Sequence, residues 1–239
     1  MFFNLDKKKC GLTPVAMEVW EGWVFINLQP NPEVSLREFL GPFGEAFSGV
    51  VYPYPENAIV MRGEFNANWK AGADAFSEAY HLSSIHPRTV APIYAGKENP
   101  YSRLVGAVVY GAHRMIATWL NREYQPGPNS KVERWVYPAV ATITGTNQEG
   151  QKTPLTAHPA INPSKSDAWA SDVNWIFPNW HIQISANRFW SHEFWPTSVN
   201  TTVWEGRFYQ PAPRTARTHS TGMVHRADGR WHARRSFEH

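Results

Sequence analysis

The sequence predicts an α+β fold in which one antiparallel sheet has its helices on one side. Two observations predict this class. Short runs rich in aromatic and β-branched residues, separated by Gly, Pro and Asn clusters, fill most of the chain from residue 100 onward. Before them, residues 68–87 place apolar side chains at helical spacing. The length of 239 residues fits one large domain or two small ones.

The expected elements follow from local patterns. Residues 12–28 are expected to form a hairpin, because alternating and then continuous apolar residues flank Glu21-Gly22. A short helix is expected at 35–39, a loop at 42–55 and a strand at 59–65. Further strands are expected at 104–110, 114–120, 135–144, 175–185, 189–197 and 202–209. Loops are expected at 145–152 and 159–167.

The composition supports a packed domain. Hydrophobic residues make up 42% of the chain and charged residues 18%, which excludes general disorder. Aromatic residues reach 14%, with 12 Trp, and suit either a large apolar pocket or a core built from large side chains. No apolar run approaches the roughly 18 residues that span a bilayer. No signal peptide opens the chain, so we expect a cytoplasmic protein with no membrane partner.

Cysteine usage and charge exclude further classes. The single cysteine, Cys10, excludes an intramolecular disulfide framework and any site in this chain built from several thiolates. The net charge is +3, and residues 219–239 supply +2 of it, since four arginines there face two acidic residues. The rest of the chain shows no obvious basic patch, so we expect no nucleic-acid partner.

The segment 68–87 reads NWKAGADAFSEAYHLSSIHP and is expected to be helical. Either Asn66 or Asn68 can cap its start. Asp74, Glu78 and His81 follow one another at spacings of four and three, so they are expected to share one face. An apolar face is expected from Trp69, Ala73, Phe76 and Tyr80.

His81 and His86 are metal-ligand candidates whose spacing constrains the helix. Five steps of about 100° place them roughly 140° apart, so the helix must end or bend if both bind one ion. Ser83-Ser84 and Pro87 permit this. Two histidines and one carboxylate form the facial triad of non-haem Fe(II) oxygenases.

Ordinary structural roles are an alternative for each of these residues. His81 can be a buried histidine with satisfied hydrogen bonds, and His86 can be a cation favoured at a helix end. Glu78 can be a solvated helix residue, and Asp74 can pair with Lys70, four residues earlier.

Asn68-Trp69-Lys70, followed by Asp74, Glu78, His81 and His86-Pro87 at this spacing, resembles the iron-site signature of Rieske non-haem iron oxygenases. These are the α subunits of ring-hydroxylating dioxygenases and related monooxygenases. The opening at 12–28 resembles the junction that follows the family's Rieske domain. Two later segments, 176–179 and 205–209, resemble strands of its catalytic domain. The resemblance covers roughly residues 12–218.

The resemblance implies a helix-grip, START-like catalytic domain, in which an antiparallel sheet wraps around a C-terminal helix. It implies that His81 and His86 are iron ligands. Glu78 would bridge the iron to a Rieske cluster on a neighbouring subunit. Asp74 would support the site by orienting a ligand or its hydrogen bonds, and Tyr80 would pack beside the iron.

The chain also departs from the family pattern. Residues 1–30 are interpreted as the junction that follows a missing Rieske domain, and 31–218 as the catalytic iron domain. No Asp after Arg217 matches the family's third iron ligand. We therefore hypothesise that residues 219–239 are an aberrant tail read out of frame, and that the C-terminal helix is lost.

The resemblance also implies an activity. The intact enzyme would take electrons from NAD(P)H through a partner reductase, sometimes with a ferredoxin. They would pass through a 2Fe-2S cluster, which this chain lacks, to a mononuclear Fe(II). Oxygen activated there would hydroxylate an apolar or aromatic substrate, as in aromatic hydrocarbon catabolism. A homotrimer or an α3β3 assembly is implied, and the chain as written is expected to be inactive.

Two other functions remain open from the sequence. The first is a non-catalytic module of the same fold that binds a hydrophobic ligand, and the second is a hydrolase with zinc at His81 and His86. Metal content separates the first from an oxygenase. Candidate pocket residues, chosen by position alone, are Trp119, Asn174, Phe177 and Trp190.

Overall fold

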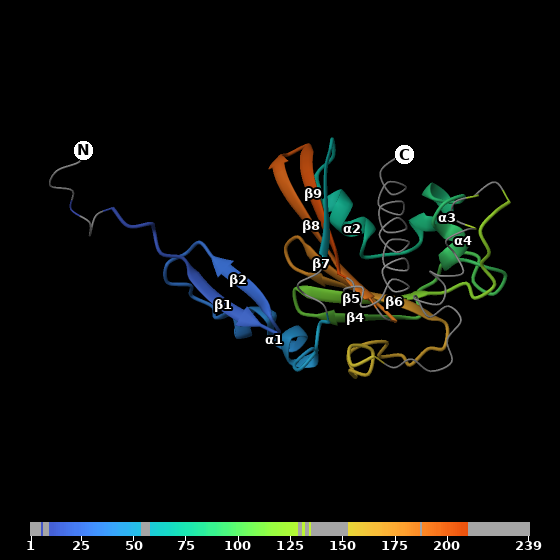
Figure 1. Ribbon diagram of the computed structural model, residues 1–239, viewed down its shortest axis with the longest axis horizontal. Helices are drawn as coiled ribbons and strands as arrows, with labels where there is room; N and C mark the ends of the chain where they lie inside the picture. Colours follow the sequence, from blue (N-terminus) through green and yellow to red (C-terminus); the bar gives the residue numbers. More distant parts are fainter. Residues whose placement is uncertain are drawn as a thin grey trace, which may run out of the picture.

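The computed structural model describes residues 6, 10–53, 58–128, 131, 134, 153–186 and 188–209. Within these residues a seven-stranded antiparallel sheet has the order β3-β9-β8-β7-β6-β5-β4, and a separate hairpin has the order β1-β2 (Figure 1). The strands of the large sheet are β3 (Ala58–Phe65), β4 (Gly106–Tyr110), β5 (His113–Trp119), β6 (Trp169–Ile176), β7 (Trp180–Ser185), β8 (Arg188–Ser198) and β9 (Thr201–Tyr209). The predicted α+β class with one main antiparallel sheet is confirmed.

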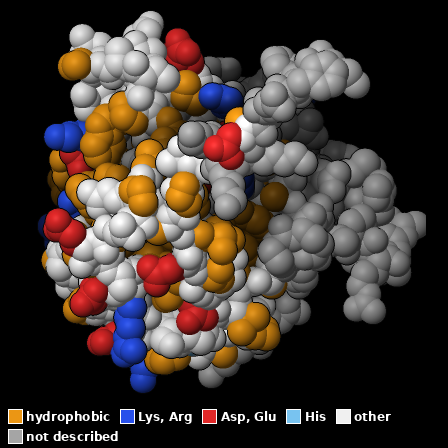
Figure 2. All heavy atoms as spheres, turned by 90° about the vertical axis from the view of Figure 1, so that its left-hand side faces the viewer, with side chains coloured by type: hydrophobic (Ala, Val, Ile, Leu, Met, Phe, Trp, Pro, Cys, Tyr) orange, Lys and Arg blue, Asp and Glu red, His pale blue; other side chains and the backbone are white. Residues whose placement is uncertain are grey.

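The hairpin predicted at 12–28 is present as β1 (Ala16–Trp20) and β2 (Trp23–Asn27). Glu21 and Gly22 both have positive φ, 47° and 84°, as a tight two-residue hairpin turn requires. One face of the hairpin packs inward, where the Trp23 and Trp180 rings meet edge to face at 4.8 Å. The other face is apolar and exposed, and Figure 2 views the molecule from the side on which the hairpin lies, with apolar side chains at the surface among charged ones. It carries Met17, Val19, Val24 and Ile26.

Helix α1 (Leu36–Ala46) is longer than the helix predicted at 35–39. The loop predicted at 42–55 was therefore wrong over residues 42–46, which are helical. Ser35 and Glu38 form a capping box at its start. The chain kinks at Gly41-Pro42 and then resumes the helix. The physical reason is burial, since Phe43 and the following Phe47 are 0% exposed in the main core cluster.

The helices divide between the two faces of the sheet instead of gathering on one. Ile182 and Ile184 of β7 point into the core cluster that contains α1. His181, which points to the opposite face because side chains alternate along a strand, contacts helix α2 (Trp69–Ala75). Helices α3 (His81–Ile85) and α4 (Ala91–Tyr94) follow α2.

The strand predictions held at most positions. The single strand predicted at 175–185 was wrong. This segment holds the end of β6, a turn at Phe177-Pro178 and the whole of β7. Pro178 has no N–H to give to a ladder, and its carbonyl accepts the Trp175 indole N–H at 2.9 Å. Residues 159–167 are irregular as expected. The predictions for 135–144 and 145–152, and the C-terminal helix and tail, lie outside the described residues.

No helix in the described part of the chain is long and apolar enough to cross a membrane.

Candidate metal centre

Helix α2 lies unusually close to the sheet. Asn68 caps the helix by accepting a hydrogen bond from Lys70 N at 3.0 Å, and its own amide donates to Val199 O at 2.7 Å. A Cβ added to Gly72 would lie 2.7 Å from the Phe194 ring. The glycine therefore allows the helix to approach β8, and the next residue, Ala73, is 0% exposed.

The single helix predicted over the motif was wrong. Helix α2 ends at Ala75, a turn follows, and α3 starts at His81. The carbonyl of Asp74 accepts from Ser77 N at 2.8 Å, which closes this turn. Tyr80 is 76% exposed instead of lying on an apolar face. The shared face predicted for Asp74, Glu78 and His81 is also absent, because the helix stops between the first and the second.

Glu78 and His81 meet directly. Glu78 Oε1 lies in hydrogen-bond contact with His81 Nδ1, and Oε2 accepts from the His81 backbone N at 3.2 Å. Both side chains are largely buried, at 15% exposure for His81 and 21% for Glu78. A carboxylate can only accept, so this contact assigns a proton to Nδ1, and in the neutral ring Nε2 then keeps its lone pair. Nε2 is therefore the nitrogen able to bind a metal.

His86 caps the end of α3 and its ring approaches that of His81. Its backbone N donates to Leu82 O at 3.0 Å, and its carbonyl accepts from the amide of Ala91 at 3.0 Å, at the start of α4. The two imidazole centres are 5.3 Å apart with the rings nearly perpendicular, at 77°. The helix thus ends between the two side chains, as their convergence requires.

This arrangement fits two ligands of a metal ion. An ion about 2.1 Å from each ring nitrogen separates the two ring centres by about 5 Å, which the His81–His86 pair matches. The described residues contain no group of three or more His, Cys, Asp and Glu side chains that could hold a metal. The fit is therefore partial, with two imidazoles of which one, that of His81, is positioned by a carboxylate.

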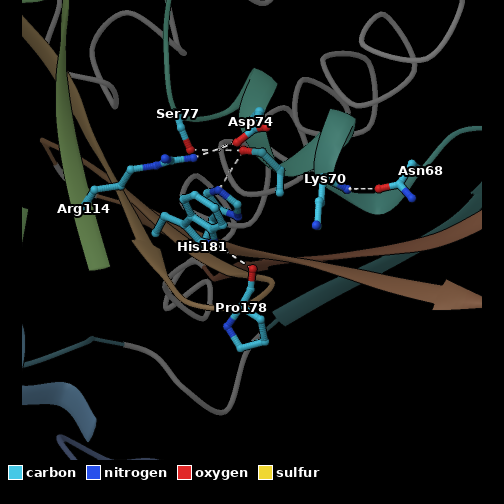
Figure 3. Close-up of polar contacts among 9 residues, drawn as sticks. Asn68, Lys70, Asp74, Ser77, Arg114, Pro178 and His181 are labelled. Atoms are coloured by element: carbon cyan, nitrogen blue, oxygen red, sulfur yellow. Dashed lines mark hydrogen bonds and ion pairs between the residues drawn. The ribbon is translucent and has the colours of Figure 1, made fainter. Parts of the chain in front are cut away.

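Asp74 contacts a different element from the one expected. Arg114, at the start of β5, donates from Nη2 to Asp74 Oδ1 at 2.8 Å (Figure 3). Within the described residues, the Asp74 carboxylate pairs with Arg114 and not with Lys70, His81 or His86. The partner lies 40 residues away in the sequence, and no local pattern indicated it.

Two buried histidines lie on the sheet beneath α2. His181 is fully buried, and burial lowers its pKa well below the usual value, with nearby His192 as the next cause. Burial likewise lowers the pKa of His192 to about 3. Both rings are therefore neutral at neutral pH. His181 Nε2 donates to Ala73 O at 3.1 Å, and His192 Nδ1 accepts from the Trp204 indole at 3.1 Å.

The same face of the sheet has a buried polar row that was not foreseen. Thr118 and Ser171 share a hydroxyl hydrogen bond of 2.8 Å, and Gln183 Nε2 donates to Ser171 Oγ at 3.0 Å. Of the pocket candidates, Trp190 shares this face, since it pairs with Gln183. Asn174 does not, because it pairs with Ile182 on the other face.

The other two pocket candidates, Phe177 and Trp119, are too exposed to form the floor of a pocket. Phe177 is 46% exposed in the β6–β7 turn, and Trp119 is half-buried beside Gly96.

Comparison with known proteins agrees with this fold and motif. The family model described as "Ring hydroxylating alpha subunit (catalytic domain)" matches residues 49–238. The carnitine monooxygenase oxygenase subunit of Escherichia coli K12 is 35% identical over 89 residues, which are 35% of this chain and 23% of that protein. The corresponding subunit of Acinetobacter pittii is 33% identical over 87 residues, with the same coverage.

Solved structures show the same fold. Naphthalene 1,2-dioxygenase from Rhodococcus superposes with a TM-score of 0.60 at 17% identity, over 92% of this chain and 51% of that chain. A quaternary ammonium Rieske monooxygenase superposes with a TM-score of 0.59 at 16% identity, over 96% of this chain and 51% of that chain. This chain therefore spans about half the length of these structures and about a quarter of the curated relatives.

The chain belongs to the family of ring-hydroxylating oxygenase α subunits, and the match falls on their catalytic domain. The resemblance deduced from the motif is thereby confirmed. The named relatives are monooxygenases and dioxygenases, which are oxidoreductases. The family match runs to residue 238, past the limit of about 218 at which the motif-based resemblance ended.

Proposed function

We propose that this chain is the catalytic part of a Rieske-type oxygenase in which His81 and His86 bind one mononuclear Fe(II). The observation that supports this most strongly is the convergence of the two imidazoles, 5.3 Å apart, with Glu78 holding the proton of His81 on Nδ1. The iron, when bound, activates O2 for hydroxylation. A ligand histidine oriented by a carboxylate is also a better electron donor to the metal.

Glu78 is proposed to act a second time, as the bridge to a Rieske 2Fe-2S cluster on a neighbouring subunit. Its carboxylate is 21% exposed and has acceptor sites beyond those that His81 uses. Electrons would come from NAD(P)H through a reductase, with or without a ferredoxin. A homotrimer or an α3β3 assembly in the cytoplasm fits this role. These partners belong to the whole protein, of which this chain spans part.

The substrate is proposed to be a small organic molecule with an apolar or aromatic part. Trp190 and Phe208 stack on the α2 side of the sheet with ring centres 6.2 Å apart. The row formed by Thr118, Ser171 and Gln183 makes the same face partly polar. The relatives named for carnitine make an aromatic hydrocarbon one choice among several, so both types belong in a substrate screen.

Iron binding is expected to be weak if no carboxylate joins the two histidines. The described residues offer no such group, and residues 210–239 lie outside them. We keep the prediction that the chain as written does not turn over. The prediction that residues 219–239 are read out of frame stands against the family match, which runs to residue 238. Resequencing the coding DNA tests the second point, because a single-base shift should restore a helix with an Asp.

Anaerobic Fe(II) loading tests the proposed site. The unsubstituted chain, His81→Ala, His86→Ala and the control His158→Ala are loaded, desalted and assayed for iron. His158 is a suitable control because its ring binds the Ser48 carbonyl far from the motif in sequence. We expect each motif variant to bind iron more than ~10-fold more weakly, and the control to match the unsubstituted chain.

Iron affinity that neither motif variant changes would contradict the proposed site. A chain that binds no metal but does bind an apolar ligand would favour the non-catalytic module instead. Zinc retained in preference to Fe(II), with hydrolytic activity, would favour the hydrolase.

A further inference from the structure

The last turn of α2 is held against the sheet by a layered stack of side chains. The guanidinium carbon of Arg114 lies 3.6 Å from the centre of the Trp175 ring. The Trp175 ring lies in turn parallel to the His181 imidazole, at 3° and 5.7 Å between centres. Both ends of this stack reach α2. Arg114 binds the Asp74 carboxylate and His181 binds the Ala73 carbonyl (Figure 3).

The stack is fixed from the sheet side. Trp175 donates its indole N–H to Pro178 O at 2.9 Å, which sets the orientation of the ring. His181 is 0% exposed and, as a neutral ring, donates through Nε2 to Ala73 O at 3.1 Å. Arg114, Trp175 and His181 stand side by side on β5, β6 and β7, because the register pairs the first with the second and the second with the third.

The two residues held by the stack also shape the chain that leads to the metal site. The Ala73 carbonyl accepts a second hydrogen bond, from Ser77 Oγ at 3.1 Å. The Asp74 carbonyl accepts from Ser77 N at 2.8 Å. The turn that ends α2 is thus built on the residues fixed by the sheet, and the next residue after Ser77 is Glu78.

Stability alone does not explain this stack. The Asp74 side chain is 64% exposed and that of Arg114 is 36% exposed. An ion pair this accessible to water contributes little to the free energy of folding. A planar guanidinium that stacks on a ring and donates a hydrogen bond at the same time does fix the orientation of the groups that it contacts. The geometry therefore serves orientation better than it serves stability.

We propose that Arg114 and His181 are positioning residues that set where Glu78 meets His81, an inference that rests on the proposed function of these two side chains. We call Asp74, Arg114, Trp175 and His181 the sheet clamp. Asp74 thus acts on the site through the backbone that it anchors, and not by binding a ligand histidine. Loss of the clamp lets the turn at Ser77 shift, and Glu78 then no longer holds the proton of His81 on Nδ1.

The test reads the tautomer of His81 directly, without any metal. Protein labelled with ¹⁵N in histidine side chains is studied by NMR near pH 8, and His81→Gln identifies the His81 signals. We expect one Nδ1–H tautomer in the unsubstituted protein and a mixture of both tautomers in Arg114→Met. Arg114→Lys, which keeps the charge but not the flat stack, should give an intermediate population.

The matched control is Arg207→Met. Arg207 pairs with Glu193 and Glu205 on the opposite face of the sheet and is 33% exposed, close to the 36% of Arg114. Its loss should lower the melting temperature by at least as much and leave the His81 tautomer unchanged. An unchanged tautomer in both Arg114 variants, or an equal change in Arg207→Met, overturns the positioning role.

Co(II), added alone as a spectroscopic probe, separates this inference from the proposed function. If Arg114→Met alters the tautomer and no chain binds Co(II), the sheet clamp stands and the metal site fails. If Co(II) binds with identical visible spectra in Arg114→Met and the unsubstituted chain, and the tautomer is unchanged, the metal site stands and the clamp fails.

Discussion

Glu78 binds His81 twice, once through the imidazole Nδ1 and once through the backbone nitrogen at 3.2 Å. The first contact selects the tautomer of the ring, and the second ties the carboxylate to the start of α3. One side chain therefore sets both the chemistry of His81 and the place where its helix begins. Glu78 and His81 are three residues apart in the sequence. Their two contacts form because α2 has already ended at Ala75, before Glu78.

Glu78→Gln should weaken metal binding while leaving the fold intact. The amide oxygen can still accept from Nδ1, but it has no charge to stabilise the ligand imidazole. Loss of an oriented carboxylate beside a ligand histidine lowers metal affinity about 10- to 100-fold. Titration with Fe(II) under anaerobic conditions measures this, with the exposed Glu64→Gln as the control. An affinity equal in both variants would argue against the role of Glu78.

Gly72→Ala should destabilise the protein by about 1–3 kcal/mol through overpacking. The new Cβ would lie 2.7 and 2.8 Å from two atoms of the Phe194 ring. Gly63→Ala is the control, because a Cβ there meets nothing within 4 Å. Urea unfolding compares the two. Gly72→Ala should cost less in a Phe194→Leu background than in the unsubstituted chain, and an equal cost would place the clash elsewhere.

Asp172 should make stability fall as pH rises through the weakly acidic range. Burial raises the pKa of its carboxyl group from the ordinary value of 3.8 to about 6, although Asn162 N and the Trp169 indole both donate to it. A carboxyl group with a raised folded-state pKa stabilises fully below the unfolded pKa. This stabilisation is lost as pH rises through about 6.

Comparison with Asp172→Asn isolates this effect. The unfolding free energy of the unsubstituted chain minus that of the variant should fall by about 3 kcal/mol between pH 3.5 and pH 7.5. The exposed Asp167→Asn serves as the control and should show no such fall. A flat difference for Asp172→Asn would mean that its folded-state pKa is close to the ordinary value.

The two faces of the hairpin should respond very differently to truncation. Trp23 packs edge to face on Trp180, so Trp23→Ala should cost about 3–5 kcal/mol. Val24, the next residue, points outward and is 63% exposed, so Val24→Ala should change stability by less than about 0.5 kcal/mol. Thermal unfolding of both variants checks the assignment, and equal losses would contradict it.

Local patterns predicted the parts of the fold whose cause is local. Glu21-Gly22 between apolar runs indicated the hairpin. Either Asn66 or Asn68 was expected to cap the motif helix, and Asn68 caps α2. The end of α2 could not be read in the same way. The Ala73 carbonyl is shared with His181, 108 residues further along the chain. Sheet contacts stop this helix after Ala75, whereas its own residues favour continuation.

The candidate site also contains residues with local contacts, which the sequence indicated, and a residue with a distant partner, which it did not. The histidine and carboxylate pattern indicated Glu78, His81 and His86, whose contacts lie within a few residues of one another. Asp74 was named, but its partner Arg114 comes from β5, and a pairing across 40 residues leaves no periodic signal. The described residues form no group of three or more His, Cys, Asp and Glu side chains that could hold a metal, so the sequence pattern and the structure together supply two ligands.

The coordination of iron in the loaded protein tests the central claim most directly. Protein loaded anaerobically with Fe(II) is measured by X-ray absorption at the iron edge, alongside His86→Ala. We expect two imidazole nitrogens about 2.1 Å from the iron, and one in the variant. Iron bound without imidazole, or the same two imidazoles in His86→Ala, would show that His81 and His86 do not form the site.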